Sequence, residues 1–481
     1  MLTCVLGGQQ MKLKKIIQGV EIVNDISKIY NEEIKMLSNK LDECYDGCVY
    51  FCYAGQQIDG HNMDLEHLKE CAKALVVEHF IDIDIPQIVV KDSRQAMALM
   101  AQNFYETKDM CIIGITGTNG KTTNAFLIAH ILKQSGKKVG IIGTQGIYFA
   151  NQKLPAKLTT PDPIDLHEII SIMKKAGVTH IVMEVSAHAI ALKKVEGINF
   201  IAKILTNITE DHLDFFETME NYSKTKLEFM KDAPIRIYPS DDAYAQNEIL
   251  KSDDILTFGI NNPSDAFSIE MSGDCSSYIL NICDFVTNVN SHLYGLFNVY
   301  NVLSASLCAL ALGVDIKTIK IAIESFKGVE GRFNVIKLSD DIKIIVDFAH
   351  TPDGLENVLK TARNITTGKL VCLFGCGGNR DRQKRKIMGE VADKYADFIY
   401  VTSDNPRYEN PIDIIEDIVC GIKSKNFLTN IDRAATISIA IKNLKPFDTL
   451  LVCGKGAENY IDIKGEKIPY SDFEQINKNI R

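Results

Sequence analysis

The chain has 481 residues, of which 46% are hydrophobic and 24% charged, and its formal net charge at pH 7 is −9. A chain of this length divides into about two to four domains with ample core, and its negative charge argues against a broad nucleic-acid-binding surface. No apolar run approaches the length that spans a membrane. Many of the 13 cysteines lie inside apolar runs, as free thiols do in a reducing cytosol. Residues 1–10 lack the pattern of a signal peptide, and Met11 is a candidate later start that would leave them as a disordered extension.

The N-terminal part of the chain is expected to form a small α/β domain. Short apolar runs there alternate with turn residues and with amphipathic segments. The predicted elements are strands at 48–53, 74–77 and 87–91, a helix through Leu65, Leu68 and Ala72, and a helix capped by Asp92.

Residues 110–123 predict a phosphate-binding loop. An apolar strand leads into the turn Gly117-x-x-Gly120-Lys121-Thr122, and a helical pattern follows it. Glycines let backbone N–H groups approach phosphates, and the start of a helix favours an anion. The spacing is shorter than the strict Walker pattern, and an ordinary glycine turn is the alternative. We predict that Lys121 reaches the β and γ phosphates of ATP and that Thr122 binds Mg²⁺. The loop's predicted ATP contacts are Gly117, Thr118, Asn119, Gly120, Lys121, Thr122 and Thr123.

Strands alternate with helices in the rest of the chain, which predicts parallel doubly wound sheets with ligands at the carboxyl ends of the strands. The predicted strands are 138–143, 180–185, 201–205, 342–347, 369–374, 398–402 and 448–453, with helices at 164–176 and within 295–325. We therefore expect an α/β protein of three domains. These are an N-terminal UDP-substrate-binding domain (1–108), a central ATP-binding P-loop domain with a mainly parallel sheet (109–333) and a C-terminal, amino-acid-binding Rossmann-like domain (334–481).

Polar residues follow several of these strands. Glu184 ends an apolar strand, and a buried carboxylate is costly unless it is paired or binds a metal; a capping role is the alternative. His212 lies in a polar stretch after the next strand, whereas Lys226 alone indicates a solvated helix lysine. Arg380 and Arg407 follow two C-terminal strands and suit a carboxylate or a phosphate, because guanidinium binds such oxygens in a bidentate way.

Together the motifs resemble the Mur ligase superfamily, in its UDP-N-acetylmuramoyl-tripeptide synthetase branch. They occur in the family's order, at residues 116–123, 159–162, 183–188, 206–214, 295–301, 331–332, 346–353, 375–381, 404–407 and 454–458.

The resemblance implies an ATP-dependent acid–amino-acid ligase of peptidoglycan precursor synthesis, and so of cell wall biogenesis, cell shape and cell division. In such enzymes ATP phosphorylates the γ-carboxylate of UDP-N-acetylmuramoyl-L-alanyl-D-glutamate, and the amine of a diamino acid displaces phosphate. The Asp-Asn-Pro-Arg motif at 404–407 is similar to the version that takes meso-diaminopimelate. The implied protein is a cytoplasmic monomer that needs ATP and Mg²⁺, acts on small molecules, and binds neither nucleic acid nor membrane.

The resemblance also implies roles for individual residues. The catalytic set would be Lys121, Glu184, His212 and a carbamylated Lys226. The Mg²⁺ ligands would be Thr122, Glu184, His212 and Lys226. Further ATP contacts would be Asn298, Asn301, Arg332 and Asp347. The UDP-substrate contacts would be Thr159, Thr160, Ser186 and Lys194. The amino-acid contacts would be Arg380, Asp404, Asn405, Pro406, Arg407, Gly454 and Glu458.

Departures from the family's pattern keep two alternatives open. Those that concern the UDP-sugar side are Leu158, Leu192, Lys194 and the segment Lys40-Leu-Asp42, and the others are Glu210, Phe216 and Ala457. One alternative is a related ligase with another acceptor carboxylate or amino acid. The other is a nucleotide-binding module without catalytic activity.

Overall fold

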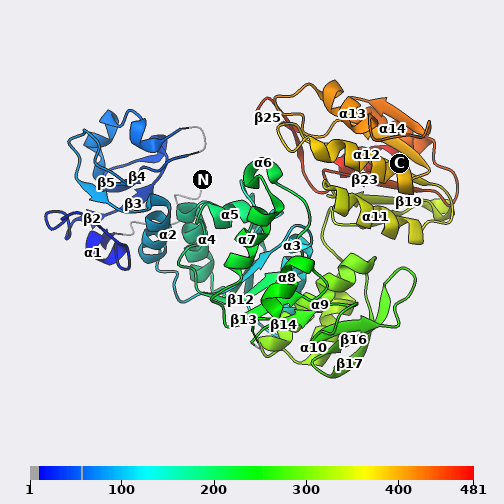
Figure 1. The fold of residues 1–481 in the computed structure, drawn as a ribbon, viewed down its shortest axis with the longest axis horizontal. Coiled ribbons are helices and arrows are strands. Elements are labelled where there is room, and N and C mark those ends of the chain that lie inside the picture. Colours follow the sequence, from blue (N-terminus) through cyan, green and yellow to red (C-terminus); the bar gives the residue numbers. More distant parts are fainter. Residues whose placement is uncertain (1–9, 56–57, 253, 481) are drawn as a thin grey trace. The chain divides into compact units, whose positions relative to one another are not determined.

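The computed structural model describes residues 10–55, 58–252 and 254–480 (Figure 1). The chain forms two compact units, the first from residues 1–114 and 137–201 and the second from 115–136 and 202–481. The chain passes between them within β7 (Cys111–Thr116), after Gly136, and within β12 (Phe200–Leu205). Residues 1–9 of the expected N-terminal extension lie outside the described residues. In the part of the chain that is described, no helix is long and apolar enough to cross a membrane.

The first unit contains a four-stranded parallel sheet in the order β3-β4-β5-β6. Its two faces bury separate apolar clusters, one against α1 and α2 and the other against the segment around Leu65 and Leu68. Asp92 caps α2 as predicted, with its side chain accepting from the backbone N–H of Gln95. The elements are β1 (Met11–Lys12), α1 (Leu13–Ile16), β2 (Glu33–Ile34), β3 (Met36–Ser38), β4 (Cys48–Phe51), β5 (Ala72–Val77), β6 (Gln87–Val89) and α2 (Ser93–Phe104).

The predicted helix through Leu65, Leu68 and Ala72 is wrong. Only a short 3-10 helix, Glu66–Glu70, forms there, and Ala72 is the first residue of β5. Strand β5 pairs with β4 from Ala72 onward and with β6 from Leu75 onward. Because Ala72 pairs within the sheet, the predicted α-helix cannot extend through it.

The remaining strands of the first unit have the order β10-β9-β8-β11. Strands β8 and β11 are parallel, as predicted, whereas β9 and β10 add an antiparallel hairpin that the sequence analysis did not anticipate. The elements are β8 (Val139–Gly143), β9 (Gly146–Phe149), β10 (Gln152–Leu154), α4 (Pro163–Lys175), β11 (His180–Glu184) and α5 (Ala187–Ala191).

In the second unit, β12, β13, β14 and β15 run parallel, and β15, β16 and β17 continue as antiparallel strands. The predicted helical region 295–325 is two helices separated by a turn at Gly313. The elements are α3 (Lys121–Gln134), α6 (Leu213–Phe216), α7 (Met219–Phe229), β13 (Ile235–Pro239), α8 (Ala243–Ile249), β14 (Leu256–Phe258), β15 (Ala266–Ile269), β16 (Ser277–Ile282), β17 (Phe285–Asn290), α9 (Leu296–Ala311) and α10 (Ile316–Ser325).

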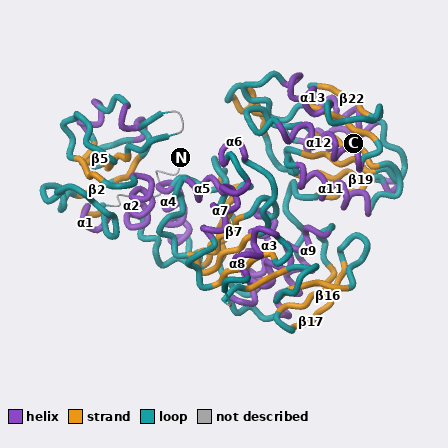
Figure 2. Tube along the Cα trace, viewed as in Figure 1, coloured by secondary structure: helices purple, strands orange, loops and turns teal. Residues whose placement is uncertain are grey.

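The C-terminal part of the second unit is a six-stranded sheet in the order β18-β19-β23-β20-β21-β22, parallel except for β18 (Figure 2). Helices α11, α12 and α13 pack on one face, and α14 and α15 on the other. The elements are β18 (Asn334–Lys337), β19 (Lys343–Asp347), α11 (Pro352–Asn364), β20 (Leu370–Phe374), α12 (Gln383–Tyr395), β21 (Phe398–Thr402), α13 (Pro411–Val419), β22 (Phe427–Asn430), α14 (Arg433–Lys442), β23 (Thr449–Cys453), β24 (Tyr460–Ile463), β25 (Glu466–Pro469) and α15 (Asp472–Asn479).

Parallel strands that alternate with helices make this an α/β protein, as predicted. Because β19, β20, β21 and β23 are parallel, their carboxyl ends share one edge of the C-terminal sheet. The predicted amino-acid-binding loops all start at that edge. The domain boundaries at 108/109 and 333/334 stay a prediction.

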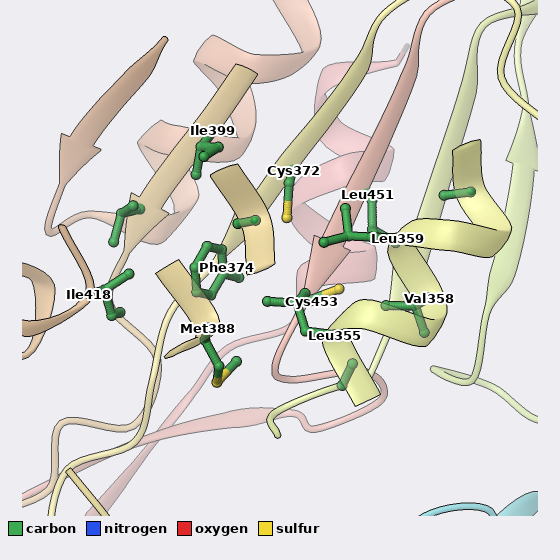
Figure 3. Close-up of a cluster of buried hydrophobic side chains, with 14 of the residues drawn as sticks. Leu355, Val358, Leu359, Cys372, Phe374, Met388, Ile399, Ile418, Leu451 and Cys453 are labelled. Carbon is green, nitrogen blue, oxygen red and sulfur yellow. The ribbon is translucent and has the colours of Figure 1, made fainter. Parts of the chain in front are cut away.

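Phe374 lies at the centre of the cluster that holds α11, α12 and α13 to this sheet, and it has no exposed surface (Figure 3). We expect Phe374→Ala to lower the free energy of unfolding of this region by about 3–5 kcal/mol, because truncation removes buried apolar surface and leaves a cavity. Urea unfolding checks this, with Phe285→Ala as the control because the Phe285 side chain is half exposed. Equal stability of the two variants would contradict the assigned core.

Candidate active site

The predicted phosphate-binding loop connects β7 to α3. Gly117 has φ = 144° and Gly120, the residue before the helix, has φ = 87°, conformations that glycine adopts without strain. Lys121 Nζ donates to the carbonyl oxygens of Gly117 and Thr118 at 2.7 and 2.9 Å. The lysine ammonium therefore lies over its own loop, beside the N-terminal turn of α3, where an anion binds most favourably.

The loop that follows β12 braces the phosphate-binding loop. Thr206 Oγ1 donates to the carbonyl oxygen of Asn119 at 2.6 Å, and Asn207 Oδ1 accepts from the Asn119 N–H at 2.9 Å. The Asn207 carbonyl accepts from the Thr118 N–H at 2.9 Å. The sequence predicted only that Thr206 and Asn207 lie in a polar stretch after a strand. In the structure their hydrogen bonds fix the backbone of the phosphate-binding loop.

Gly117→Ala should damage this loop. An added Cβ would lie 1.8 Å from Thr206 Oγ1, and the positive φ would be strained as well. We expect kcat/KM for ATP to fall by about 10²-fold, since small displacements of a phosphate-binding group are costly. The control is Gly136→Ala, which shares a positive φ of 85° but has nothing within 4 Å of the new Cβ. Steady-state kinetics with unchanged kcat/KM in Gly117→Ala would contradict the described packing.

Lys226 is buried, which corrects the interpretation of a solvated helix lysine. Its side chain has no exposed surface, and Nζ donates to the Tyr222 hydroxyl at 2.7 Å and to Thr118 Oγ1 at 3.1 Å. Burial and the nearby charge of Lys121 lower the pKa of Lys226 well below its ordinary value. Burial therefore favours the neutral form of the amine, which lies against the phosphate-binding loop.

His212 is the residue before α6 and has φ = 56°. Its Nε2 lies 3.3 Å from the carboxylate of Asp211, which is itself buried. Burial alone would raise the pKa of Asp211, but the charges of His212, His350 and Lys384 outweigh it and lower the pKa to about 2. Asp211 is therefore an anion at neutral pH. Of these four residues, only His212 was predicted as a site residue.

Glu184 belongs to the first unit, where it ends β11 and has no exposed surface. Its two carboxylate oxygens accept from the N–H and the hydroxyl of Thr144, both at 3.0 Å. Thr159 Oγ1 lies 3.1 Å from the same hydroxyl, and Thr160 Oγ1 donates to the Glu184 carbonyl at 3.0 Å. The Ser186 N–H donates to Thr160 Oγ1 at 3.1 Å. The first unit thus brings Glu184 together with three of the predicted UDP-substrate contacts.

The fourth of those contacts, Lys194, forms an ion pair with Asp162 at 2.8 Å, also in the first unit. Thr122, His212 and Lys226, the other predicted Mg²⁺ ligands, belong to the second unit. A single metal site that includes Glu184 stays a prediction.

Arg332 extends from the C-terminal part of the second unit to the phosphate-binding loop. Its Nη2 donates to Thr122 Oγ1 at 3.1 Å, and its guanidinium lies 4.3 Å from the centre of the Phe348 ring. Asp347 accepts from the N–H groups of Phe333 and Ala349 at 2.7 and 2.6 Å. Burial raises the pKa of Asp347, although Arg332 and these hydrogen bonds oppose the shift.

Asn298 and Asn301 lie buried in a polar network between α9 and α3. Asn301 Nδ2 donates to Asn298 Oδ1 at 3.0 Å, and Asn301 Oδ1 accepts from Asn124 Nδ2 at 3.0 Å. A Cβ on Gly120 would lie 2.6 Å from Asn301 Oδ1. The two asparagines therefore support the start of α3, and their predicted contact with ATP stays a prediction.

The predicted amino-acid contacts gather at the carboxyl ends of β20, β21 and β23. Asn405 Nδ2 donates to Glu458 Oε2 at 3.0 Å, and Arg407 Nη1 donates to the Gly378 carbonyl at 2.7 Å. Arg407 therefore contacts the loop that carries Arg380, and burial and the charge of Arg407 lower the pKa of Arg380. Asp404 and Pro406 are buried beside Asn405, and Gly454 (φ 111°) would place a Cβ 2.4 Å from Asp404 Oδ2.

Comparison with known proteins assigns the chain to a family. Residues 115–309 match the family described as Mur ligase middle domain, and residues 331–456 match Mur ligase, glutamate ligase domain. A Clostridium tetani protein named UDP-N-acetylmuramoyl-L-alanyl-D-glutamate--2,6-diaminopimelate ligase is 38% identical, and the match covers 97% of this chain and 99% of that protein. The chain belongs to the Mur ligase family. A Bacillus velezensis protein of the same name is 36% identical over 98% of this chain and 99% of its own.

A solved structure of a ligase with that name agrees with the Mur ligase fold. It is 27% identical, with a TM-score of 0.70, and the match covers 98% of this chain and 99% of the other. The predicted family and fold class are therefore confirmed, and the chain is a ligase of the Mur family.

Lys455 and Arg433 are buried basic residues of this Mur ligase that were not among the predicted site residues. Lys455 has no exposed surface and donates to Asn405 Oδ1 at 3.1 Å and Glu458 Oε2 at 3.0 Å. Arg433 forms a fully buried bidentate pair with Asp472, at 2.8 and 2.7 Å, and donates to the Cys453 carbonyl at 2.8 Å. Lys455 lies within the predicted motif at 454–458, so the sequence showed a lysine at this position but not its burial. Arg433 and its partner are separated by 39 positions, and no local pattern links them.

Proposed function

We propose that this Mur ligase uses ATP to join meso-diaminopimelate to the γ-carboxylate of UDP-N-acetylmuramoyl-L-alanyl-D-glutamate, in peptidoglycan precursor synthesis. The observation that carries the choice of amino acid is the pair of guanidinium groups of Arg380 and Arg407 on neighbouring strand ends. The names of the two relatives, which match over nearly their whole length, support the same acceptor and amino acid here.

The phosphate-binding loop fits the first step of this reaction, the transfer of the γ-phosphate of ATP to the acceptor carboxylate. Carboxylate and triphosphate are both anions, so their approach needs fixed positive potential. Lys121 and the N-terminal turn of α3 supply it at the same place. The amine of the amino acid then attacks the acyl phosphate and releases inorganic phosphate.

In the second unit, Thr122, His212 and Lys226 would hold Mg²⁺, which when bound neutralises phosphate charge. The state of Lys226 fits this assignment. Burial favours its neutral amine, and a neutral amine reacts with carbon dioxide to form a carbamate and release a proton. A carbamate presents carboxylate-like oxygens, the donors that Mg²⁺ prefers.

Meso-diaminopimelate carries a carboxylate at each end. Arg407 would bind the distal carboxylate, because a guanidinium can donate two parallel hydrogen bonds to it. Arg380 would add positive potential, and Asn405, Glu458 and Gly454 would line the same pocket. These substrates are soluble metabolites, so we place the protein in the cytoplasm. We also propose that it is a monomer that binds no nucleic acid and does not insert into a membrane.

Phosphate release tests the proposed function. The purified chain is given ATP, Mg²⁺ and the UDP-linked dipeptide, with or without meso-diaminopimelate, and L-lysine replaces the amino acid in a further arm. We expect release only when acceptor and diaminopimelate are both present. Phosphate release with a different acceptor carboxylate would favour the alternative of a related ligase with another acceptor. ATP binding without any turnover would refute ligase activity.

A further inference from the structure

Two loops of the C-terminal sheet carry the arginines of the proposed amino-acid pocket, and their backbones are tied together. Loop 375–382 follows β20 and loop 403–410 follows β21. The Gly378 N–H donates to the Asn405 carbonyl at 2.9 Å, and the Gly378 carbonyl accepts from Arg407 Nη1 at 2.7 Å. The Tyr408 N–H donates to Asn379 Oδ1 at 3.0 Å. A Cβ on Gly378 would lie 2.0 Å from the Pro406 carbonyl oxygen, so the approach is close.

Arg385 and Glu409 form the charged part of this tie. The Arg385 side chain, in the first turn of α12, has no exposed surface. Its Nη1 and Nη2 each donate to one carboxylate oxygen of Glu409, both at 2.9 Å, and Nη1 also donates to Asp417 at 2.9 Å. Glu409 accepts in addition from the Asn379 N–H. One carboxylate therefore joins loop 403–410, which contains it, to loop 375–382 and to α12.

The tie opposes a repulsion that the pocket creates. Arg380 on one loop and Arg407 on the other are both cations, and the charge of Arg407 contributes to the lowered pKa of Arg380. Like charges on neighbouring loops repel each other, and contacts between the loops oppose that repulsion. The Arg385 hydrogen bonds lower the pKa of Glu409, so Glu409 stays ionised and available for the tie.

We propose that Arg385 and Glu409 are positioning residues that set the affinity for the incoming amino acid, by holding loops 375–382 and 403–410 at the separation that its carboxylate requires. This inference rests on the proposed function. Neither residue is assigned a contact with substrate. They act through Arg407, which would donate two parallel hydrogen bonds to the carboxylate, and through Arg380, which would add positive potential beside it.

Glu409→Gln is the primary test. We expect KM for meso-diaminopimelate to rise about tenfold, while kcat and KM for ATP stay within about twofold, because the change displaces binding groups of one substrate only. Arg385→Lys should give a smaller rise in the same KM, since it keeps the charge but loses the two parallel hydrogen bonds. A uniform loss of all three parameters would indicate a general structural role and overturn the proposal.

Asp397→Asn is the matched control. Asp397 also accepts from an arginine, Arg363 Nη2 at 2.6 Å, and from a backbone N–H, that of Leu370 at 2.8 Å. It lies at the amino ends of the same two strands, β20 and β21, away from the pocket. We expect its KM for the amino acid to equal that of the wild type. A rise as large as that of Glu409→Gln would overturn the proposal.

A double mutant separates positioning from stability. In an Arg407→Ala background, Glu409→Gln should add less than about twofold to KM, because the group that the tie positions is already absent. Full additivity of the two changes would contradict positioning through Arg407.

Amide hydrogen exchange provides a readout that needs no substrate. The Asn379 N–H donates a hydrogen bond to Glu409. It should exchange faster in Glu409→Gln than in the wild type. If the wild type does not turn over diaminopimelate, the proposed function fails, and this exchange alone decides whether the tie holds the loops. Unchanged exchange at Asn379 would overturn the tie.

Discussion

Lys226→Ala is expected to lower kcat by about 10³-fold, equivalent to about 4 kcal/mol of transition-state stabilisation. The buried amine of Lys226, whose pKa burial lowers, lies against the phosphate-binding loop through Thr118 and Tyr222. Truncation removes the group that would carry the carbamate. Single-turnover kinetics of phosphate release measure the effect, and removal of bicarbonate and carbon dioxide should lower the activity of the wild type in the same direction.

Lys224→Ala is the control for this change, since Lys224 lies on the same helix but is exposed. It should keep the activity of the wild type. Acetate or formate should restore part of the activity of Lys226→Ala by supplying the missing carboxylate. Full activity in Lys226→Arg, whose guanidinium forms no carbamate, would refute this role.

Arg407→Ala should raise KM for meso-diaminopimelate by about 10²-fold or more, since removing one partner of a hydrogen-bonded charge pair costs about 2–5 kcal/mol. Arg407 extends along loop 375–382, where its Nη1 meets the Gly378 carbonyl. KM for ATP should change little, because the predicted ATP contacts Lys121 and Arg332 lie at the phosphate-binding loop. Initial-rate kinetics with each substrate varied in turn check both statements.

Arg363→Ala serves as the control, because the Arg363 side chain is half-buried and pairs with Asp397 away from the pocket. If Arg407→Ala kept the wild-type KM for diaminopimelate, the assignment of this amino acid would fail. A variant that lost diaminopimelate but used L-lysine equally well would place the specificity at Arg407 even more directly.

Much of the fold followed from local patterns. The strand before Gly117 and the helix after Gly120 were predictable because glycine positions and apolar periodicity act over a few residues. The strands that end at Asp347, Phe374 and Cys453 were found for the same reason. The helix through Leu65 failed because pairing with distant strands decided the structure of that segment. The antiparallel strands β15, β16 and β17 were not predicted, since apolar and polar residue types alternate only weakly along them, although burial alternates along β15 and β16.

The site was less predictable than the fold, because its electrostatics depend on burial. Lys226 stands in a polar helical stretch, and only the packing of α7 shows that its amine is buried against Tyr222. The pairs Arg385–Glu409 and Arg433–Asp472 join residues 24 and 39 positions apart. Such pairs have no periodicity that a single sequence could reveal. The free-energy cost of burying their charges and the gain from pairing them both depend on the protein interior.

In the proposed reaction, the γ-phosphoryl group of ATP bound at Lys121 is transferred to a carboxylate oxygen of the acceptor. The acceptor is prepared with ¹⁸O in its γ-carboxylate, and the wild type is run with ATP, Mg²⁺ and meso-diaminopimelate. Mass spectrometry of the released phosphate then shows which oxygens it carries. An acyl phosphate intermediate predicts one ¹⁸O atom in each phosphate released. Phosphate without ¹⁸O would mean that water or another group received the γ-phosphate, and it would contradict the proposed reaction.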